Sequence, residues 1–315
     1  MEKETTSYEM DGTVILRHSI RASMRDGAVL RGYYYEREIP VARGRYAITA
    51  HPTPLLCIPT ELGNSQQHHE FALRLARLNG APKRIYTIDL RGRGASELGT
   101  TTAAETEIDT EDLITFCEAL GLHGADLIVN GRSAIAVLLT GPKRPSLFNK
   151  LVFNDAAPMF DGVGIARLTA LRQRQQIPKN WGEALANLKQ LKGEDFPLLS
   201  DADWDGLVHA IWKEEKGKLL PSISAGLVRQ TNAVSYEEKQ LQAWQELKIF
   251  QNNPSLLIRG ENSQLLSDEI AAQFSKSMAD FQTITAKGQG HVPLLYLDNL
   301  PDKILSFLRE EETDT

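Results

Sequence analysis

The sequence LIVNGRSAIAVLL, residues 127–139, decides the fold of this chain of 315 residues. Its first three residues are branched and apolar, which predicts a buried strand, and Ala134 to Leu139 predicts a helix that follows almost at once. A sharp turn from a strand into a helix is the arrangement that presents a nucleophilic serine, so Ser133 is a candidate nucleophile. A glycine is expected two residues after such a serine, and Ile135 stands there instead.

Short apolar runs alternate with longer amphipathic runs on both sides of this turn. Strands are predicted at 55–59, 84–90, 125–130, 150–155, 255–260 and 281–288, and helices at 66–80, 106–121, 267–278 and 301–311. This alternation predicts an α/β fold with a doubly wound, mostly parallel sheet and helices on both faces. Arg25-Asp26-Gly27 indicates a hairpin turn ahead of these runs. We expect about the first 12 residues, which are polar, to fray.

The alternation stops near residue 157 and resumes near residue 248. The intervening segment predicts helices and loops without strands, and it holds all four tryptophans of the chain. Ser200 is a possible N-cap of one of these helices, with Asp203 at the third helical position. We therefore expect a core of residues 1–156 and 248–315 and a helical lid of residues 157–247 over the strand ends. The tryptophans are expected mainly in the lid core and partly along a pocket.

Composition excludes several classes of function. The formal net charge is −6, which offers neither a basic surface for nucleic acid nor a polybasic membrane patch. No run approaches the ~18 apolar residues of a membrane span, and the polar N-terminus does not resemble a signal peptide. Cys57 and Cys117 lie in apolar contexts and are expected to be buried thiols. We expect a cytoplasmic protein, either a monomer or a homodimer, that acts on a small molecule.

Three segments follow predicted strands, where doubly wound sheets bind their ligands. One carries Ser133, the second is FNDAAP with Asp155, and the third is GQGHVPLL with His291. A histidine in a glycine-flanked loop can reach a serine and take its proton. Taken alone, Ser133 is explained as a helix N-cap and His291 as a loop histidine, but their joint placement favours a catalytic site.

These segments, together with IDLRGRGASE (88–97) and PSLLIRGENSQLLS (254–267), resemble the α/β-hydrolase superfamily and its lidded branch of esterases and C–C hydrolases. The resemblance implies that Ser133 is the nucleophile and His291 the general base. It also implies an oxyanion hole formed by the backbone N–H groups of Glu61 and Ala134. The glycine-rich motif at 89–96 is implied to be structural. Serine at the turn argues against the aspartate-dependent epoxide hydrolases and haloalkane dehalogenases of this fold.

The third member of the implied triad departs from the family pattern. The resemblance places an aspartate where Gln264 stands, and an amide cannot stabilise an imidazolium by charge. In serine proteases, replacing the triad aspartate by its amide costs about 10⁴ in rate. Asp155 is the leading substitute, with a capping or loop role as the ordinary alternative. Glu261 is a weaker candidate, and a site without an acid remains open.

The loop implied to form the oxyanion hole departs from the family pattern as well. Pro59 and Thr60 occupy the place where relatives have His-Gly, and the carboxylate of Glu61 would oppose an oxyanion unless it points away. Thr60 could supply a hydroxyl donor instead. His68-His69 invite a metal site, but adjacent residues face different sides of a helix and no third ligand joins them at ligand spacing. RGRGASELG lacks the Gly-Lys-Ser/Thr of a phosphate loop, so nucleotide binding is not expected.

The expected function is that of a serine hydrolase acting on a small, largely apolar ester, thioester or carbon–carbon (β-diketone-like) substrate. Ser133 would attack, His291 would shuttle the proton and Asp155 would orient the histidine, without any cofactor. The alternative function belongs to another class. The departures from the family pattern cluster at the strand-to-helix turn, the oxyanion loop and the acid. They also suit a hydrolase-fold protein that binds a small molecule and has lost or changed its chemistry. Retention of both Ser133 and His291 favours the enzyme.

Overall fold

A computed structural model describes residues 4–38, 51–100, 105–174, 177–224 and 236–310. Nine strands form one sheet in the order β1-β2-β3-β5-β4-β6-β7-β10-β11. They are β1 (Thr5–Met10), β2 (Thr13–Ser23), β3 (Val29–Arg37), β4 (Leu55–Ile58), β5 (Ile85–Asp89), β6 (Ala125–Asn130), β7 (Phe148–Asn154), β10 (Ser255–Gly260) and β11 (Phe281–Ala286). From β5 to β11 all neighbours are parallel, while β1, β2 and β3 extend the sheet as an antiparallel meander.

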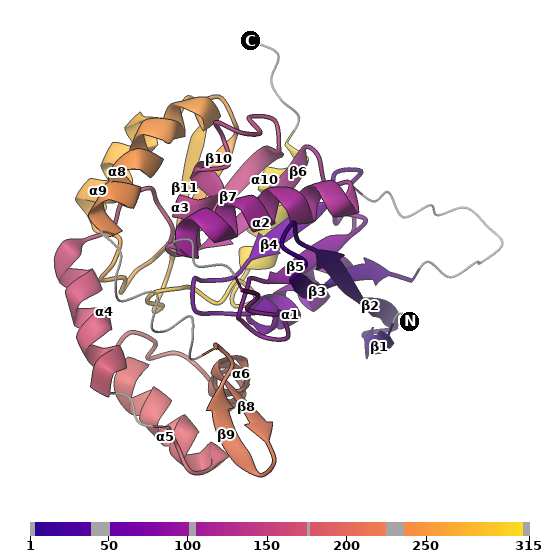
Figure 1. Cartoon of the computed structure of the whole chain (residues 1–315), viewed down its shortest axis with the longest axis vertical. Coiled ribbons are helices and arrows are strands. Elements are labelled where there is room, and N and C mark those ends of the chain that lie inside the picture. The colour runs from indigo at the N-terminus through magenta and orange to yellow at the C-terminus, as the bar shows by residue number, and fades with distance from the viewer. Residues whose placement is uncertain (1–3, 39–50, 101–104, 175–176, 225–235, 311–315) are drawn as a thin grey trace.

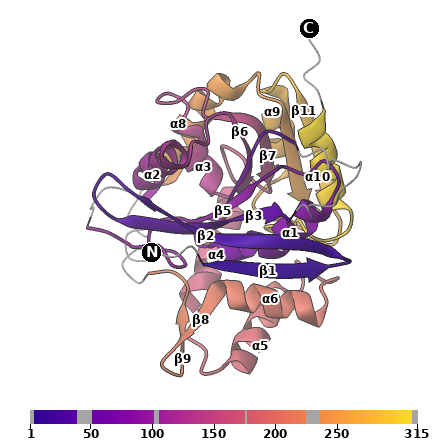
Figure 2. The ribbon, with the colours of Figure 1, turned by 90° about the vertical axis from the view of Figure 1, so that its right-hand side faces the viewer.

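Helices cover both faces of the sheet (Figures 1 and 2). One face packs against α2 (Glu105–Leu120), α3 (Ser133–Leu138), α8 (Tyr236–Glu246) and α9 (Asp268–Lys276), through buried side chains such as Phe116 and Phe274. The other packs against α1 (His69–Arg77) and α10 (Leu300–Arg309), through Phe71 and Ile304. The short helices η1 (Ser65–His68) and η2 (Leu247–Phe250) precede α1 and follow α8. The predicted doubly wound architecture is confirmed.

The N-terminal hairpin is confirmed, but the expected fraying of the first residues is wrong. The turn between β2 and β3 contains Gly27 at φ +87°, a backbone conformation that glycine adopts without strain. Thr5–Met10 forms β1 and pairs along its whole length with β2. Tyr8 and Met10 hold this edge strand in place because both pack against the core of the α1/α10 face.

The segment between β7 and β10 contains α4 (Gly162–Arg174), α5 (Trp181–Lys192) and α6 (Asp201–Ile211). It also contains a hairpin of β8 (Trp212–Glu215) and β9 (Lys218–Pro221), which corrects the expectation of a segment without strands. Lys216 and Gly217 form the hairpin turn with φ of +53° and +74°, and two positive φ values match the twist of such short strands. Figure 1 shows α5, α6 and the hairpin together at one end of the molecule.

This end of the molecule has its own hydrophobic core, which includes Phe196, Trp204, Val208, Trp212 and Leu219. The predicted cap of α6 is present as a full capping box, in which Ser200 and Asp203 each bond the other's backbone N–H. By contrast α8, which falls within the predicted lid range, packs on the main core through Ala243. The lid boundaries at 157 and 247 stay a prediction.

Cys57 and Cys117 are both buried free thiols, as expected. Burial raises the pKa of each, to about 12 for Cys117, so neither is a thiolate near neutral pH. Among the described residues, no helix is both long enough and apolar enough to cross a bilayer.

A buried arginine in the glycine-rich motif fixes the loop after β4. Arg93 is fully buried, and its Nε donates to the Glu61 carbonyl oxygen at 2.7 Å. Its guanidinium also pairs with Asp109 at 3.0 Å and with Glu105. Two carboxylates and two carbonyl oxygens, those of Glu61 and Arg91, thus compensate one buried cation, and the arginine joins α2 to the Glu61 loop. This contact network agrees with the structural role that the resemblance implied for the motif.

We expect Arg93→Met to destabilise the fold by about 3–5 kcal/mol, because it leaves two carboxylates without their cation in the interior. Urea unfolding followed by tryptophan fluorescence measures this change. Arg144→Met is the matched control. Arg144 pairs with Glu118 at 2.7 Å with both side chains well exposed, so its loss is expected to cost about 0–1 kcal/mol. Equal costs for the two variants would contradict a structural role of the Arg93 network.

Candidate functional site

A histidine and an aspartate form a hydrogen-bonded dyad at the carboxyl ends of the strands. His291 Nδ1 lies 2.8 Å from Asp155 Oδ2, the arrangement expected of a general base and its orienting acid. Asp155 follows β7 at φ +46° and is fully buried. With the proton on Nδ1, His291 donates to the carboxylate and keeps Nε2 as the basic nitrogen. The catalytic roles of these two residues stay a prediction, with which this geometry is compatible.

The Asp155 carboxylate accepts two further hydrogen bonds. The Gly260 N–H donates to Oδ1 at 2.9 Å, and the Ser263 hydroxyl donates to Oδ2 at 2.6 Å. Both donors belong to the end of β10 and the loop after it, where the acid of the implied triad was expected. These two donors fix the orientation of the carboxyl group, so Asp155 can hold the imidazole of His291 in one position.

Glu261, the weaker acid candidate, and Gln264, which stands at the implied acid position, both point elsewhere. The exposed Gln264 donates to the Asp195 carboxylate at 3.2 Å and accepts from Arg167. Glu261 is also exposed, and its carboxylate accepts from the Gly288 N–H at 2.7 Å. Neither contacts His291, and Ser263 rather than Gln264 faces the dyad from this loop.

The strand-to-helix turn corrects the expectation for Ser133. β6 ends at Asn130, Gly131 takes φ +52°, and α3 begins at Ser133, so Gly131 forms the apex of the turn. A Cβ atom built on Gly131 would lie 2.9 Å from Cε1 and 3.0 Å from Nε2 of His291. The histidine therefore faces the glycine. A side chain at this apex would be the one in reach of the base.

Ser133 lies inside the first turn of α3. It is buried, and its Oγ makes no hydrogen bond with any described residue, including His291. The expected Ser133–His291 hydrogen bond is therefore absent. The physical reason is the spacing: Ser133 lies two positions after the apex glycine, so the helix has already turned its side chain into the packed interior.

The contacts of Ala134 and Glu61 bear on the predicted oxyanion hole, which stays a prediction. The Ala134 N–H donates to the Gly131 carbonyl oxygen at 3.2 Å, within the turn itself. The Glu61 carboxylate accepts from Arg132 Nε at 2.9 Å and from Nη2 at 2.8 Å, and both side chains are buried. An ion pair thus bridges the loop after β4 and the turn after β6. Thr60 bonds Gln67 through its backbone N–H and its hydroxyl, rather than offering that hydroxyl to a ligand.

The loop that carries His291 is held from three sides. Gln289 accepts from the Leu294 N–H at 2.7 Å, and the side-chain amide of Asn154 donates to the Pro293 carbonyl at 2.9 Å. From α5, Lys192 Nζ donates to the His291 carbonyl at 2.9 Å. The last contact couples the position of the base to the segment above the strand ends.

The two adjacent histidines diverge as predicted. His68 is buried and accepts from the Asn130 amide at 2.7 Å, while His69 Nδ1 lies 2.8 Å from the Tyr35 hydroxyl. Burial lowers the pKa of His68 to about 3 and that of His69 to about 4, so both are neutral at pH 7. Within the described ranges, no three His, Cys, Asp or Glu side chains group as they would around a metal ion.

The structure is similar to solved α/β hydrolases. An α/β hydrolase from Novosphingobium aromaticivorans superposes with a TM-score of 0.75 at 20% identity, over 93% of this chain and 98% of that one. The thioesterase domain of the curacin biosynthetic pathway gives 0.61 at 20%, over 98% and 100%. A meta-cleavage product hydrolase from Pseudomonas fluorescens gives 0.61 at 14%, over 91% and 96%. No family model and no curated protein matches the sequence. The chain has the α/β-hydrolase fold.

Sequence reasoning missed three parts of the site: the apex glycine, the Ser263 hydroxyl and the Arg132–Glu61 pair. A signal existed for the first. Gly131 directly follows the last strand residue, and glycine is the residue that takes a positive φ without strain. The Ser263 and Arg132 contacts had no local signal, because their partners lie 108 and 71 residues away in the sequence.

Acid should destabilise the fold through His68. The unfolded chain protonates this histidine below about pH 6.5, whereas the folded chain resists protonation down to about pH 3. Stability is therefore full above pH 6.5 and falls between these values, and His68 contributes a slope that approaches ~1.4 kcal/mol per pH unit. His69, whose pKa is lowered to about 4, adds to the same slope. Urea midpoints from pH 7 to 4.5 measure the slope. His68→Gln, which can still accept from Asn130, should reduce it by roughly half, and exposed His123→Gln should not change it; an unchanged slope in His68→Gln would refute this account.

Proposed function

We propose that this protein is a general-base enzyme in which His291, oriented by Asp155, takes a proton directly from a bound water molecule. No covalent intermediate with the protein forms. The observation that carries the proposal is the intact 2.8 Å His291–Asp155 hydrogen bond beside an apex residue, Gly131, that has no side chain. A base and its acid are present, and the position in reach of the base offers no nucleophile.

The geometry favours this route over attack by Ser133. To reach the imidazole, Ser133 Oγ would have to leave the interior of α3, where the whole helix is buried. Unwinding the first turn would also break the Ala134–Gly131 contact of the turn. A serine mechanism therefore requires rearrangement of a packed element, whereas a general-base mechanism uses the observed positions.

The reaction class that fits is hydrolysis of a small, largely apolar ester, thioester or carbon–carbon (β-diketone-like) substrate. Water loses its proton to His291 Nε2 as its oxygen bonds to the substrate carbonyl carbon, and the tetrahedral intermediate then expels the leaving group, which takes the proton from the imidazolium. Asp155 stabilises the imidazolium by charge. The thioesterase and the meta-cleavage product hydrolase among the structural neighbours support hydrolysis as the class.

A second candidate is binding of a small molecule without turnover. The Arg132–Glu61 ion pair favours it, because it ties the loop after β4 to the turn after β6, where the resemblance implied an oxyanion hole. In this pair, Arg132 gives two of its N–H donors to Glu61 rather than to a developing oxyanion.

Hydrolysis of p-nitrophenyl acetate and S-phenyl thioacetate separates the mechanisms. We expect Ser133→Ala to keep its rate within about threefold. His291→Ala and Asp155→Asn should lose about 10²–10⁴-fold, the range of a general base and of its orienting acid. Gln264→Ala, on the exposed side of the neighbouring loop, is the matched control and should behave as wild type.

A fluorophosphonate probe supplies the decisive contrast. The wild-type protein should not be labelled, because its base faces a glycine. Labelling that disappears in Ser133→Ala would instead establish the serine mechanism. A folded wild-type protein with neither labelling nor turnover would favour the binding protein.

A further inference from the structure

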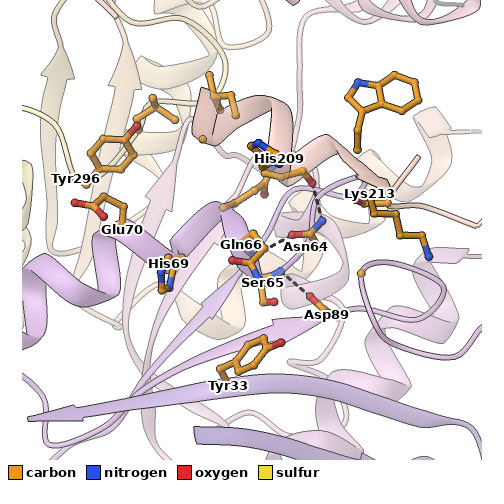
Figure 3. Close-up of a pocket in the computed structure, with 18 of the residues that line it drawn as sticks. Tyr33, Asn64, Ser65, Gln66, His69, Glu70, Asp89, His209, Lys213 and Tyr296 are labelled. Atoms are coloured by element: carbon orange, nitrogen blue, oxygen red, sulfur yellow. Dashed lines mark hydrogen bonds between the residues drawn. The ribbon is translucent and has the colours of Figure 1, made fainter. Parts of the chain in front are cut away.

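A second site lies away from the dyad. A cleft of about 830 Å³ opens between α6 with the start of β8 and the core elements η1, α1 and β3. Figure 3 shows this cleft, with side chains from both sides pointing into it. The described residues that line it include neither His291 nor Asp155, and neither Gly131 nor Ser133. The cleft is therefore a separate cavity that the general-base proposal does not use.

Aromatic rings form much of its wall. Tyr33 comes from β3, His69 from α1, Trp212 from the start of β8 and Tyr296 from the loop before α10. Leu207 and Leu294 add aliphatic surface between the rings. Walls of this kind favour a planar apolar body, because rings gain both buried area and ring–ring contacts when they stack or meet edge to face.

The acidic side chains at the cleft are already compensated. Glu70 pairs with Arg74 at 2.8 Å, and Asp203 accepts from the Tyr296 hydroxyl at 2.9 Å. Asp89 accepts from the backbone N–H groups of Ser65 and Ala95, at 2.7 and 2.9 Å. A cationic ligand would have to compete with these partners.

The basic side chains are satisfied in the same way. Arg74 also donates to the Tyr296 carbonyl oxygen at 2.9 Å, and Lys213 pairs with Glu215 at 2.8 Å. His69 carries no charge at pH 7, because burial lowers its pKa to about 4. An anionic ligand would therefore find no cation without an existing partner among these three residues.

Polar groups without charge remain for a ligand. Gln66 lines the cleft from η1, and its side chain ends in an amide that can donate and accept hydrogen bonds. His69 bonds Tyr35 through Nδ1, which leaves Nε2 as its second hydrogen-bonding atom. Together they offer a donor and an acceptor beside the aromatic wall.

We propose that this cleft binds an uncharged aromatic molecule with a hydrogen-bonding substituent, of the phenol or naphthol class. The rings of Tyr33, Trp212 and Tyr296 hold its body, and Gln66 and His69 bond its substituent. The site is independent of the His291–Asp155 dyad, so each proposal can fail without the other.

Gly206 provides a clean test, because it lines the cleft from α6 and a Cβ atom there meets no heavy atom within 4 Å. Gly206→Leu should therefore fill the cleft without a clash in the protein. Gly162→Leu is the matched control: Gly162 begins α4, is equally open, and does not line the cleft.

Calorimetric titration with 2-naphthol and 2-naphthoate at pH 7.5 measures binding. We expect 2-naphthol to bind wild type and Gly162→Leu alike. Gly206→Leu should weaken 2-naphthol binding at least tenfold. Wild type should bind 2-naphthoate at least tenfold more weakly than 2-naphthol. Absence of 2-naphthol binding, unchanged affinity in Gly206→Leu, or a preference for 2-naphthoate would overturn the proposal. His291→Ala should bind 2-naphthol normally. Loss of binding in that variant would place the ligand at the dyad and overturn the separate site, while leaving the general-base mechanism intact.

Discussion

The buried carboxylate of Asp155 is the interaction on which the site depends. It gathers a backbone N–H from the end of β10, a hydroxyl from the following loop and the imidazole of His291 around two oxygens. Buried polar groups are tolerated when hydrogen bonds replace their hydration. The same three bonds that satisfy the carboxyl group also set the position of the His291 imidazole, and they join β7, β10 and the histidine loop at one edge of the sheet.

In this arrangement His291 and Asp155 remain hydrogen-bonded to each other, and the residue that faces the histidine is Gly131. Gly131 at the apex satisfies the positive φ of a sharp strand-to-helix turn without strain, but it brings no functional group. Ser133 contributes its hydroxyl to the interior instead. The Arg132–Glu61 pair then links the two loops that flank the turn. Together these features leave a His–Asp dyad that faces a glycine in a chain with the α/β-hydrolase fold.

The segment above the strand ends touches the site and also forms a cavity of its own. Lys192 reaches the backbone of His291, and Asn64 donates to the Ala210 carbonyl at 2.7 Å, where both residues line the second cleft. Contacts at both places anchor α5 and α6 to the core. The same segment therefore holds the base in position and closes one wall of a second pocket.

Local patterns in the sequence were sufficient for much of the architecture. Apolar runs and helical spacing predicted the parallel strands, the helices on both faces, the β2–β3 hairpin and the cap of α6, because each depends on residues close together in the chain. They missed β1, which is held by packing against a distant core, and the β8–β9 hairpin, whose strands have only four residues each.

The sequence by itself also determined that Asp155 and His291 follow strands at one sheet edge. Only the tertiary structure decided what they meet. A shift of two residues along the turn exchanges Gly131 for Ser133 in front of the histidine. The spacing of a sequence motif does not determine which of these two residues occupies the apex. The backbone dihedral at the apex resolves it, and that angle follows from how the strand and helix pack together.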